Sequence, residues 1–159
     1  MSRPLILAAL LAMFASAATA APRVVTASGR WAALRGETAC EAASLTLLPA
    51  TRTRAQGRAS LAFEPGKRHG EFAAMLSRPA RPGAAVILTI DDTPFLLVAR
   101  GASAWSRGPV QEAAIIAAMR SAGGMRIEGH GPGGRFVDRY ALDGAPTAID
   151  AAAACAASL

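Results

Sequence analysis

Residues 84–100 read AAVILTIDDTPFLLVAR and contain two β-prone runs separated by a pair of aspartates. The first run, 84–90, is rich in β-branched side chains, and the second, 95–100, is almost continuously apolar after Pro94. Asp91 and Asp92 are typical of a tight turn, because an aspartate side chain can hydrogen-bond to its own backbone there. A carboxylate pair for acid–base chemistry is the alternative interpretation. The stretch predicts two neighbouring strands.

Further short apolar runs precede this pair. Residues 58–64 alternate polar and apolar side chains, which is the period of a half-buried strand. Pro65–Gly66 then supplies a turn. The expected elements are a first strand at 24–34 that breaks at Gly29, an apolar run of undetermined type at 42–48, an exposed loop at 51–57, the strand at 58–64 and its returning partner at 71–77.

The chain after the pair contains the clearest helix signal. Residues 109–122 begin with Pro109, which is favoured at the first helical position, and Gly123–Gly124 follow as a stop. A brief continuation of the sheet at 101–105 precedes this helix. The remaining predictions are strands at 125–128 and 135–142, a hairpin loop at Gly129–Gly134 that joins them, and a final helix over roughly 146–156.

Many short strands with two helical segments are typical of an all-antiparallel architecture. We therefore expect a mainly β fold: an antiparallel β-sandwich with an inserted helix and a C-terminal helix. Residues 21–159 have the length of one domain. The sequence predicts that they form a single β-sandwich domain.

Residues 1–20 have the three parts of a secretory signal peptide. Arg3 supplies a positive charge, residues 5–14 are apolar, and Ala18–Thr19–Ala20 offers an A-x-A cleavage site. The strongly apolar part is shorter than the roughly 20 residues that a transmembrane helix needs, and no later segment is long and apolar enough. We expect cleavage after Ala20 and export to the periplasm, with association with the outer membrane left open.

The basic charge does not by itself indicate a nucleic-acid partner. Seventeen basic and 11 acidic residues give a net charge of +6, which becomes +5 if Arg3 leaves with the signal peptide. The basic residues are scattered, apart from Arg52, Arg54 and Arg58 and the pair Lys67–Arg68. The few aromatic residues lie in apolar runs rather than among the arginines. The sequence predicts no nucleic-acid binding. Weak attraction to an anionic cell surface remains open.

Cys40 and Cys155 are the two cysteines of the chain. An even number of cysteines in an exported protein is most simply a disulfide, so we expect a Cys40–Cys155 bridge that ties the C-terminal helix to the N-terminal strands. A reactive thiol is the alternative, although neither cysteine belongs to a C-x-x-C motif.

The glycine-rich run Gly129–Gly134 resembles a phosphate cradle or the oxyanion loop of esterases. A phosphate loop must open a helix, whereas a strand is expected after this run. An esterase needs a G-x-S-x-G elbow, which the sequence lacks. We therefore interpret the run as a turn.

A hydrolase that uses a serine and a histidine is the main catalytic alternative. The chain has two histidines, His69 and His130, but their spacing selects no partner. Two separated histidines and an oxidised cysteine pair do not supply a zinc site, so no metal or cofactor is expected. Trp31, Phe95 and Trp105 are interpreted as core residues, with a ligand groove as the alternative. Candidate partners for a histidine are Ser60, Glu71, Ser77, Ser106 and Asp138.

Several segments share a pattern with a known family. These are Thr93–Val98, the helix at Val110–Met119, Gly124–Ile127 and the closing run Asp138–Asp150, with Trp31 ahead of Cys40 near the start. Together they resemble the invasion-associated locus B family of alphaproteobacterial envelope proteins. The resemblance implies a β-sandwich fold and export, and it carries over no catalytic residue.

The function expected from these observations is that of an exported, non-catalytic periplasmic or cell-envelope protein that binds a protein or envelope component. The small periplasmic hydrolase described above is the alternative. A third interpretation is an inhibitor or chaperone-like binder of another exported protein, which would need an exposed apolar patch or a free sheet edge.

Overall fold

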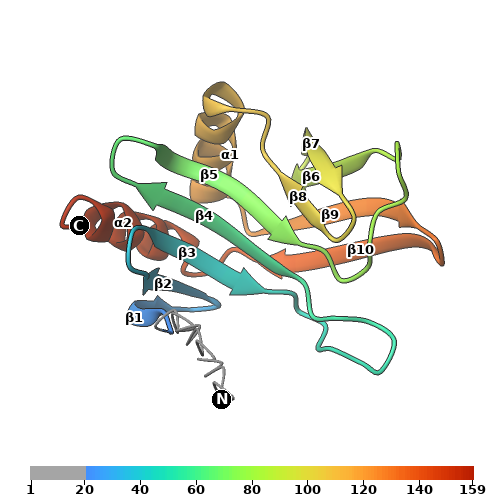
Figure 1. Ribbon diagram of the computed structural model, residues 1–159, viewed down its shortest axis with the longest axis horizontal. Coiled ribbons are helices and arrows are strands. Elements are labelled where there is room, and N and C mark those ends of the chain that lie inside the picture. The colour runs from blue at the N-terminus through green and yellow to red at the C-terminus, as the bar shows by residue number, and fades with distance from the viewer. Residues whose placement is uncertain (1–20) are drawn as a thin grey trace, which may run out of the picture.

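Ten strands form one continuous antiparallel sheet in the computed structural model, which describes residues 21–159 (Figure 1). The predicted signal peptide, residues 1–20, lies outside the described residues. The strands follow the order β1-β2-β3-β4-β5-β8-β7-β6-β9-β10 across the sheet. The elements are β1 (Arg23–Ser28), β2 (Trp31–Arg35), β3 (Cys40–Leu45), β4 (Arg58–Glu64), β5 (Arg68–Met75), β6 (Val86–Ile90), β7 (Thr93–Arg100), β8 (Ser103–Trp105), α1 (Pro109–Ser121), β9 (Gly124–Gly131), β10 (Gly134–Ala141) and α2 (Ala145–Ala156).

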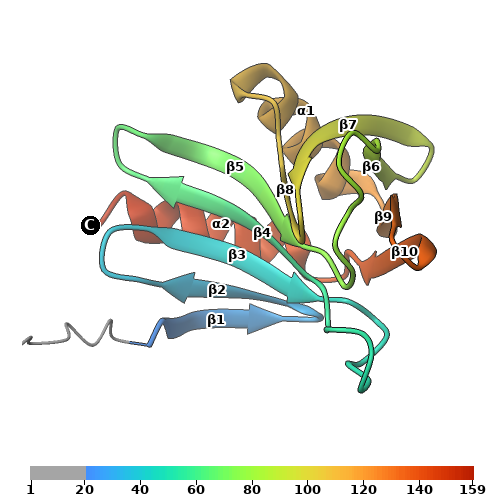
Figure 2. The same ribbon diagram turned by 45° about the vertical axis from the view of Figure 1, so that its right-hand side comes forward.

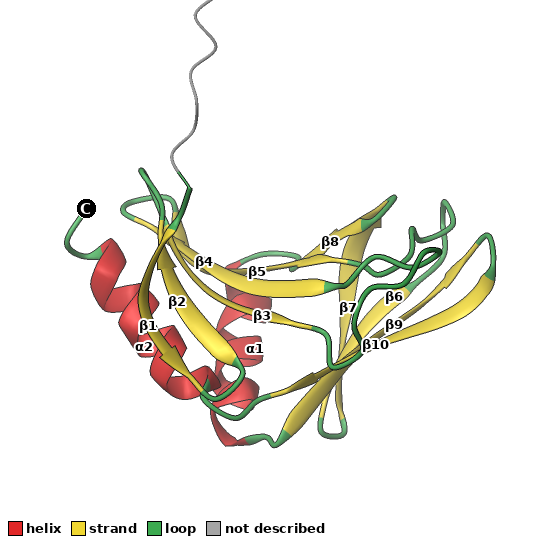
Figure 3. Ribbon diagram, turned by 90° about the horizontal axis from the view of Figure 1, so that it is seen from below, coloured by secondary structure: helices red, strands yellow, loops and turns green. Residues whose placement is uncertain are grey.

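Strand β7 joins the two halves of the sheet. Its first part pairs with β6, from Ile90↔Thr93 to Val86↔Leu97, and its last part pairs with β8, from Val98↔Trp105 to Arg100↔Ser103. Both helices lie on the same side of the sheet (Figure 3). The predicted mainly β, sandwich-like antiparallel fold with an inserted and a C-terminal helix is therefore confirmed, and its two halves are parts of one sheet.

The core lies between the helices and the inner face of the sheet. Helix α2 contributes Ile149 and Ala152 against β2 and β3, and helix α1 contributes Ile115 and Met119. Figure 2 shows α2 behind β3 and β4, and the helix also contacts β1 and β2. Fully buried side chains of the strands complete this core, among them Trp31, Leu61, Phe72, Leu88, Ile127 and Tyr140.

The start of α2 is fixed to the β1–β2 turn by a glycine. Gly144 has a φ of +83°, and a Cβ atom at this position would lie 1.8 Å from the backbone oxygen of Ser28. Arg30 N also donates a hydrogen bond of 3.1 Å to Asp143 O. Only glycine tolerates both the left-handed backbone and this close approach.

Two predicted segments differ in detail from the structure. The expected strand at 24–34 is a hairpin, because Gly29 turns the chain between β1 and β2. The first part of the apolar run of undetermined type, residues 42–45, belongs to β3, and residues 46–48 follow the strand as a loop. The Asp91–Asp92 turn is confirmed, since Ile90 pairs directly with Thr93 across it.

The glycine-rich hairpin loop is shorter than predicted. Strand β9 continues to Gly131 and β10 begins at Gly134, so only Pro132 and Gly133 form the turn. The reason is packing: a Cβ atom at Gly129 would lie 2.7 Å from the ring of Phe136. At Gly131 it would lie 2.5 Å from Pro79 O. These glycines serve close contacts within a strand and do not build a loop.

The predicted disulfide between Cys40 and Cys155 is confirmed. It joins β3 to the last turn of α2 across a sequence separation of 115, with the two Cα atoms 6.0 Å apart. Both residues are buried. The bridge therefore holds the C-terminal helix against the sheet, as expected. Neither described helix combines the length and the apolar character needed to cross a membrane.

Candidate functional site

A groove of about 730 Å³ crosses the outer face of the sheet over β2, β3 and β4. Its floor is apolar and is formed by Ala32, Leu34, Ala43 and Leu45. Alternation along a strand places these residues opposite the core-facing Trp31, Ala33 and Ala42. The register agrees, because Ala32 is paired with Ala43 across the β2–β3 ladder. The volume lies within the range of roughly 300 to 1,000 Å³ that is usual for ligand sites.

Polar side chains line the walls of this groove. Arg58, on β4, forms an ion pair with Glu41 of β3, and Gln56 Nε2 donates a hydrogen bond of 3.2 Å to Thr46 O. Arg30 and Asp143 lie at the end where the β1–β2 turn meets α2. The groove thus combines an apolar floor with hydrogen-bonding and charged groups at its margins.

Arg30 is a free cation at the groove. Its guanidinium group forms no ion pair or hydrogen bond with any other residue of 21–159, whereas its backbone oxygen accepts a hydrogen bond of 2.8 Å from Ser44 Oγ. The Ser44 contact fixes the main chain and leaves the long side chain exposed. An exposed, unpaired guanidinium can bind a carboxylate or phosphate of a partner in a bidentate manner.

Three exposed leucines lie at the end of β3 and in the loop that follows it. Leu45 has 50% of its surface exposed, and Leu47 and Leu48 in the following loop have 42% and 55%. Backbone contacts hold this loop, since Thr46 N bonds to Gly57 O at 2.9 Å and Leu47 N to Arg139 O at 2.8 Å. The leucines are therefore presented by a fixed segment, and exposed apolar groups of this kind mark interaction surfaces when they cluster.

The predicted histidine candidates do not come together with a serine. His69 lies on β5 and His130 on β9, and both side chains are exposed. Within residues 21–159 neither imidazole is hydrogen-bonded to a serine. Ser106, which is buried, donates instead to Glu112 Oε1 at 3.0 Å. The candidate serines Ser60 and Ser77 are also buried.

Strand β10 carries two buried polar side chains, Asp138 and Tyr140, whose burial was not predicted from the sequence. Asp138 is 3% exposed, and its Oδ2 atom accepts a hydrogen bond of 2.8 Å from the backbone N–H of Ser77. The hydroxyl of Tyr140 is also buried and has no hydrogen-bond partner among the described residues. Burial, and secondarily the charge of Asp138, raises the pKa of Tyr140 well above its usual value. The spacing of Phe136, Asp138 and Tyr140 was the signal, because alternate residues of a strand share one face.

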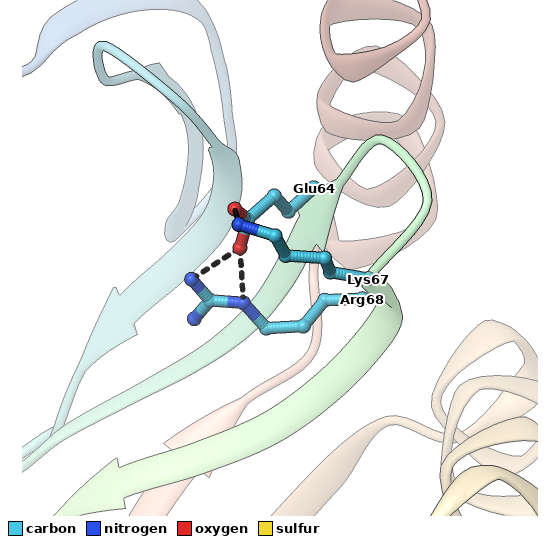
Figure 4. A network of polar contacts seen from close by, with 3 residues as sticks. All are labelled: Glu64, Lys67 and Arg68. Atoms are coloured by element: carbon cyan, nitrogen blue, oxygen red, sulfur yellow. Dashed lines mark hydrogen bonds and ion pairs between the residues drawn. The ribbon is translucent and has the colours of Figure 1, made fainter.

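A carboxylate at the β4–β5 turn is held by two cations (Figure 4). Glu64 Oε1 accepts a hydrogen bond from Lys67 Nζ at 2.9 Å, and Glu64 Oε2 accepts from Arg68 Nη2 at 2.7 Å. The hydrogen bond from Lys67, followed by that from Arg68, lowers the pKa of Glu64. The Glu64 carboxylate is thus hydrogen-bonded to both Lys67 and Arg68, and this cluster stabilises the turn.

The remaining candidate residues, the aromatic residues and the possible metal ligands, do not form a site. Trp31 and Phe95 belong to the core, as interpreted from the sequence, whereas Trp105 lies on β8 and is only half-buried. Among residues 21–159 no three His, Cys, Asp or Glu side chains are grouped as metal ligands would be. Asp138, one of the candidate partners of a histidine, is used by the Ser77 backbone instead.

Comparison with known proteins gives no relative. No family model matches the chain, no curated protein matches it, and no solved structure matches it.

Proposed function

We propose that this chain is an exported, non-catalytic envelope protein of the invasion-associated locus B type, and that it binds a protein or envelope component. The observation that carries the proposal is the outer-face groove with the unpaired Arg30 at its end. An apolar floor with few polar groups at the margin is the usual composition of a binding site. The Cys40–Cys155 bridge supports export, because disulfides persist in oxidising compartments.

The proposal that the groove binds a partner is tested by photo-crosslinking in the producing cells. A photoreactive phenylalanine analogue replaces Leu45, at the groove, or Val110, which is 89% exposed on α1 and serves as the matched control. We expect a discrete crosslinked species from position 45 and none from position 110. Arg30→Glu is expected to abolish that species, and Arg107→Glu, a charge reversal at an exposed arginine outside the groove, is expected to preserve it.

Equal crosslinking from both positions, or crosslinking that survives Arg30→Glu, would reject the groove as the binding site. A purified crosslinked partner would then be remixed with the wild-type protein and with both charge variants. Only a loss of affinity confined to Arg30→Glu is consistent with the proposal.

The proposal that the protein is exported is tested by measuring its intact mass in a periplasmic extract, before and after reduction and alkylation. We expect a chain that starts at Ala21 and gains two alkyl groups only after reduction. A chain that retains Met1, or two thiols that alkylate without reduction, would contradict export.

A further inference from the structure

The two edge strands of the sheet, β1 and β10, differ in how many of their backbone groups are hydrogen-bonded to other parts of the chain. Strand β10, at one end, is partly sealed: Leu47 N donates to Arg139 O at 2.8 Å, and Trp31 Nε1 donates to Ala141 O at 2.9 Å. Strand β1, at the other end, has no such cover. Within residues 21–159, no group outside the β1–β2 ladder forms a hydrogen bond with Arg23–Ser28.

Strand β1 has no strand paired on its outer side, and its last residue, Ser28, packs closely against Gly144 at the start of α2. It forms the lower border of the sheet in Figure 2, with β2 on its inner side. Val24 and Val25 are 58% and 45% exposed. The β1–β2 register shifts between Val24 and Thr26, which leaves Val25 without a cross-strand partner. In the regular parts of an antiparallel strand, alternate residues direct both backbone groups to the same neighbour, so about half of these N–H and C=O groups face away from β2. Such an edge is a template for a further strand.

The charge around this edge indicates what kind of strand fits. Arg23 and Arg35 are direct cross-strand partners, and within residues 21–159 neither forms an ion pair. Arg35 Nη1 donates only to Ser158 Oγ, at 3.3 Å. Residues 21–36 include these two arginines and Arg30 but no acidic residue. The nearest carboxylates in the sequence are Glu37, in the turn after β2, and Glu41, which is paired with Arg58. Like charges directly opposite each other are unfavourable, and an acidic side chain laid beside them would relieve this repulsion.

From the open edge and its unpaired arginines, we propose that β1 binds an extended acidic segment of a partner protein as an eleventh strand. Backbone hydrogen bonds along Arg23–Ser28 supply the affinity, and carboxylates near Arg23 and Arg35 select the partner. A second copy of this chain is disfavoured as the occupant, because antiparallel β1–β1 pairing sets the start of one strand against the end of the other. This arrangement would place the Arg23–Arg35 pair of one copy near Arg30 of its neighbour.

The probe is an eight-residue peptide that alternates valine or threonine with glutamate, added to protein purified after export from the producing cells. Amide hydrogen exchange is followed by NMR at peptide concentrations up to the millimolar range. We expect exchange to slow at least tenfold at β1 amides and to stay unchanged along β10. The double variant Arg23→Glu and Arg35→Glu is expected to bind at least tenfold more weakly, and Arg107→Glu to bind normally.

Two control peptides separate strand pairing from simple charge attraction. The same peptide methylated on every backbone nitrogen keeps its carboxylates but has no backbone N–H donors. A version with lysine in place of glutamate keeps the backbone N–H donors but reverses the charge of the peptide. Neither is expected to bind. Binding by the methylated peptide, absence of binding at millimolar peptide, or protection outside residues 23–28 would each overturn the proposal.

Self-association is distinguished in the same samples. Slower exchange at β1 that depends on protein concentration without peptide would show that a second copy occupies the edge, which also overturns the proposal. The edge and the groove are separate surfaces, so Leu45→Glu, a groove variant, is expected to bind the peptide like the wild type. Failure of the peptide to bind therefore leaves the groove proposal unaffected.

Discussion

The indole Nε1 of Trp31 donates a hydrogen bond of 2.9 Å to the backbone oxygen of Ala141, 110 residues further along the chain. Trp31 lies on β2 and Ala141 ends β10, so this bond connects two strands from opposite ends of the sheet order. The indole itself is 1% exposed. A single side chain thus both fills the core and brings the two halves of the sheet together.

Trp31→Phe keeps an aromatic ring in the core but removes the donor to Ala141 O. We expect the free energy of unfolding to fall by about 1 to 3 kcal/mol, the cost of a lost buried hydrogen bond together with a smaller ring. Urea denaturation followed by circular dichroism measures the change. Val110→Ala, at a fully exposed position, should stay within about 0.5 kcal/mol of the wild type; a similar loss there would count against the role of Trp31.

Replacing both Cys40 and Cys155 by alanine removes the bridge between β3 and α2. The chain-entropy model predicts a loss of about 4 to 5 kcal/mol for a loop of more than a hundred residues. Urea denaturation of the wild type with and without a reducing agent should reproduce this loss, and the double variant should be insensitive to the reductant. Equal midpoints for wild type and variant in oxidising buffer would show that the bridge does not stabilise the fold.

Tyr140 is the one tyrosine of the chain, so its ionisation can be followed by ultraviolet absorbance without interference from other phenols. Its pKa is raised in the folded protein, by burial and by the charge of Asp138. We expect no phenolate absorbance at pH values just above 10, where a tyrosine in the unfolded chain titrates. The same chain in concentrated urea should titrate near the ordinary value of about 10.

The sign of the linkage follows from this shift. Because folding raises the pKa of Tyr140, its contribution to stability is complete below the unfolded pKa of about 10 and decreases as the pH rises above it. Tyr140→Phe removes a buried hydroxyl that has no partner, so it is expected to leave stability unchanged or to raise it by about 1 kcal/mol at pH 7. A loss of several kcal/mol would show that the hydroxyl is hydrogen-bonded.

Glu64→Gln tests the cluster at the β4–β5 turn. Folding lowers the pKa of Glu64, chiefly through the hydrogen bond from Lys67, so the cluster stabilises the protein above the unfolded pKa of the carboxyl group. This contribution is lost as the pH falls through the folded pKa. Comparison of urea midpoints at pH 7 and pH 3 should therefore show a smaller acid-induced drop for Glu64→Gln than for the wild type. An identical drop would contradict the prediction, and Glu37→Gln, at an exposed position, is the matched control.

The local elements were predictable because their signals are local. Alternation at 58–64 indicated β4, the Asp91–Asp92 pair indicated the turn between β6 and β7, and Pro109 with Gly123–Gly124 bounded α1. The Gly129–Gly134 run predicted a hairpin loop that is longer than the observed turn, because glycine also occurs where a neighbouring group comes too close for a Cβ atom. Those neighbours, Phe136 and Pro79, are brought near by strand pairing and loop packing, which composition does not reveal.

The candidate sites depended on information of a different kind. The Cys40–Cys155 pairing was predictable because a chain with two cysteines offers a single intramolecular pair. The groove, by contrast, is lined by residues of three strands, of the β1–β2 turn and of the loops, including Asp143 just before α2, and no single segment carries its pattern. Likewise, the sequence offered Asp138 as a candidate partner of a histidine, whereas in the folded chain it accepts a hydrogen bond from the backbone N–H of Ser77.

The amino-acid sequence by itself determined the mainly β class, the positions of most strands and both helices, and the disulfide. Periodicity and turn residues are properties of short segments, and two cysteines allow a single intramolecular pairing. Only the tertiary structure decided that β7 links two half-sheets, that the chain partly seals the β10 edge, and that no strand pairs with the outer side of β1, where Arg23 forms no ion pair within residues 21–159. The strand order and the exposure of the sheet edges arise from contacts between residues far apart in sequence. The free energy of each such contact depends on which surfaces the folded chain brings together.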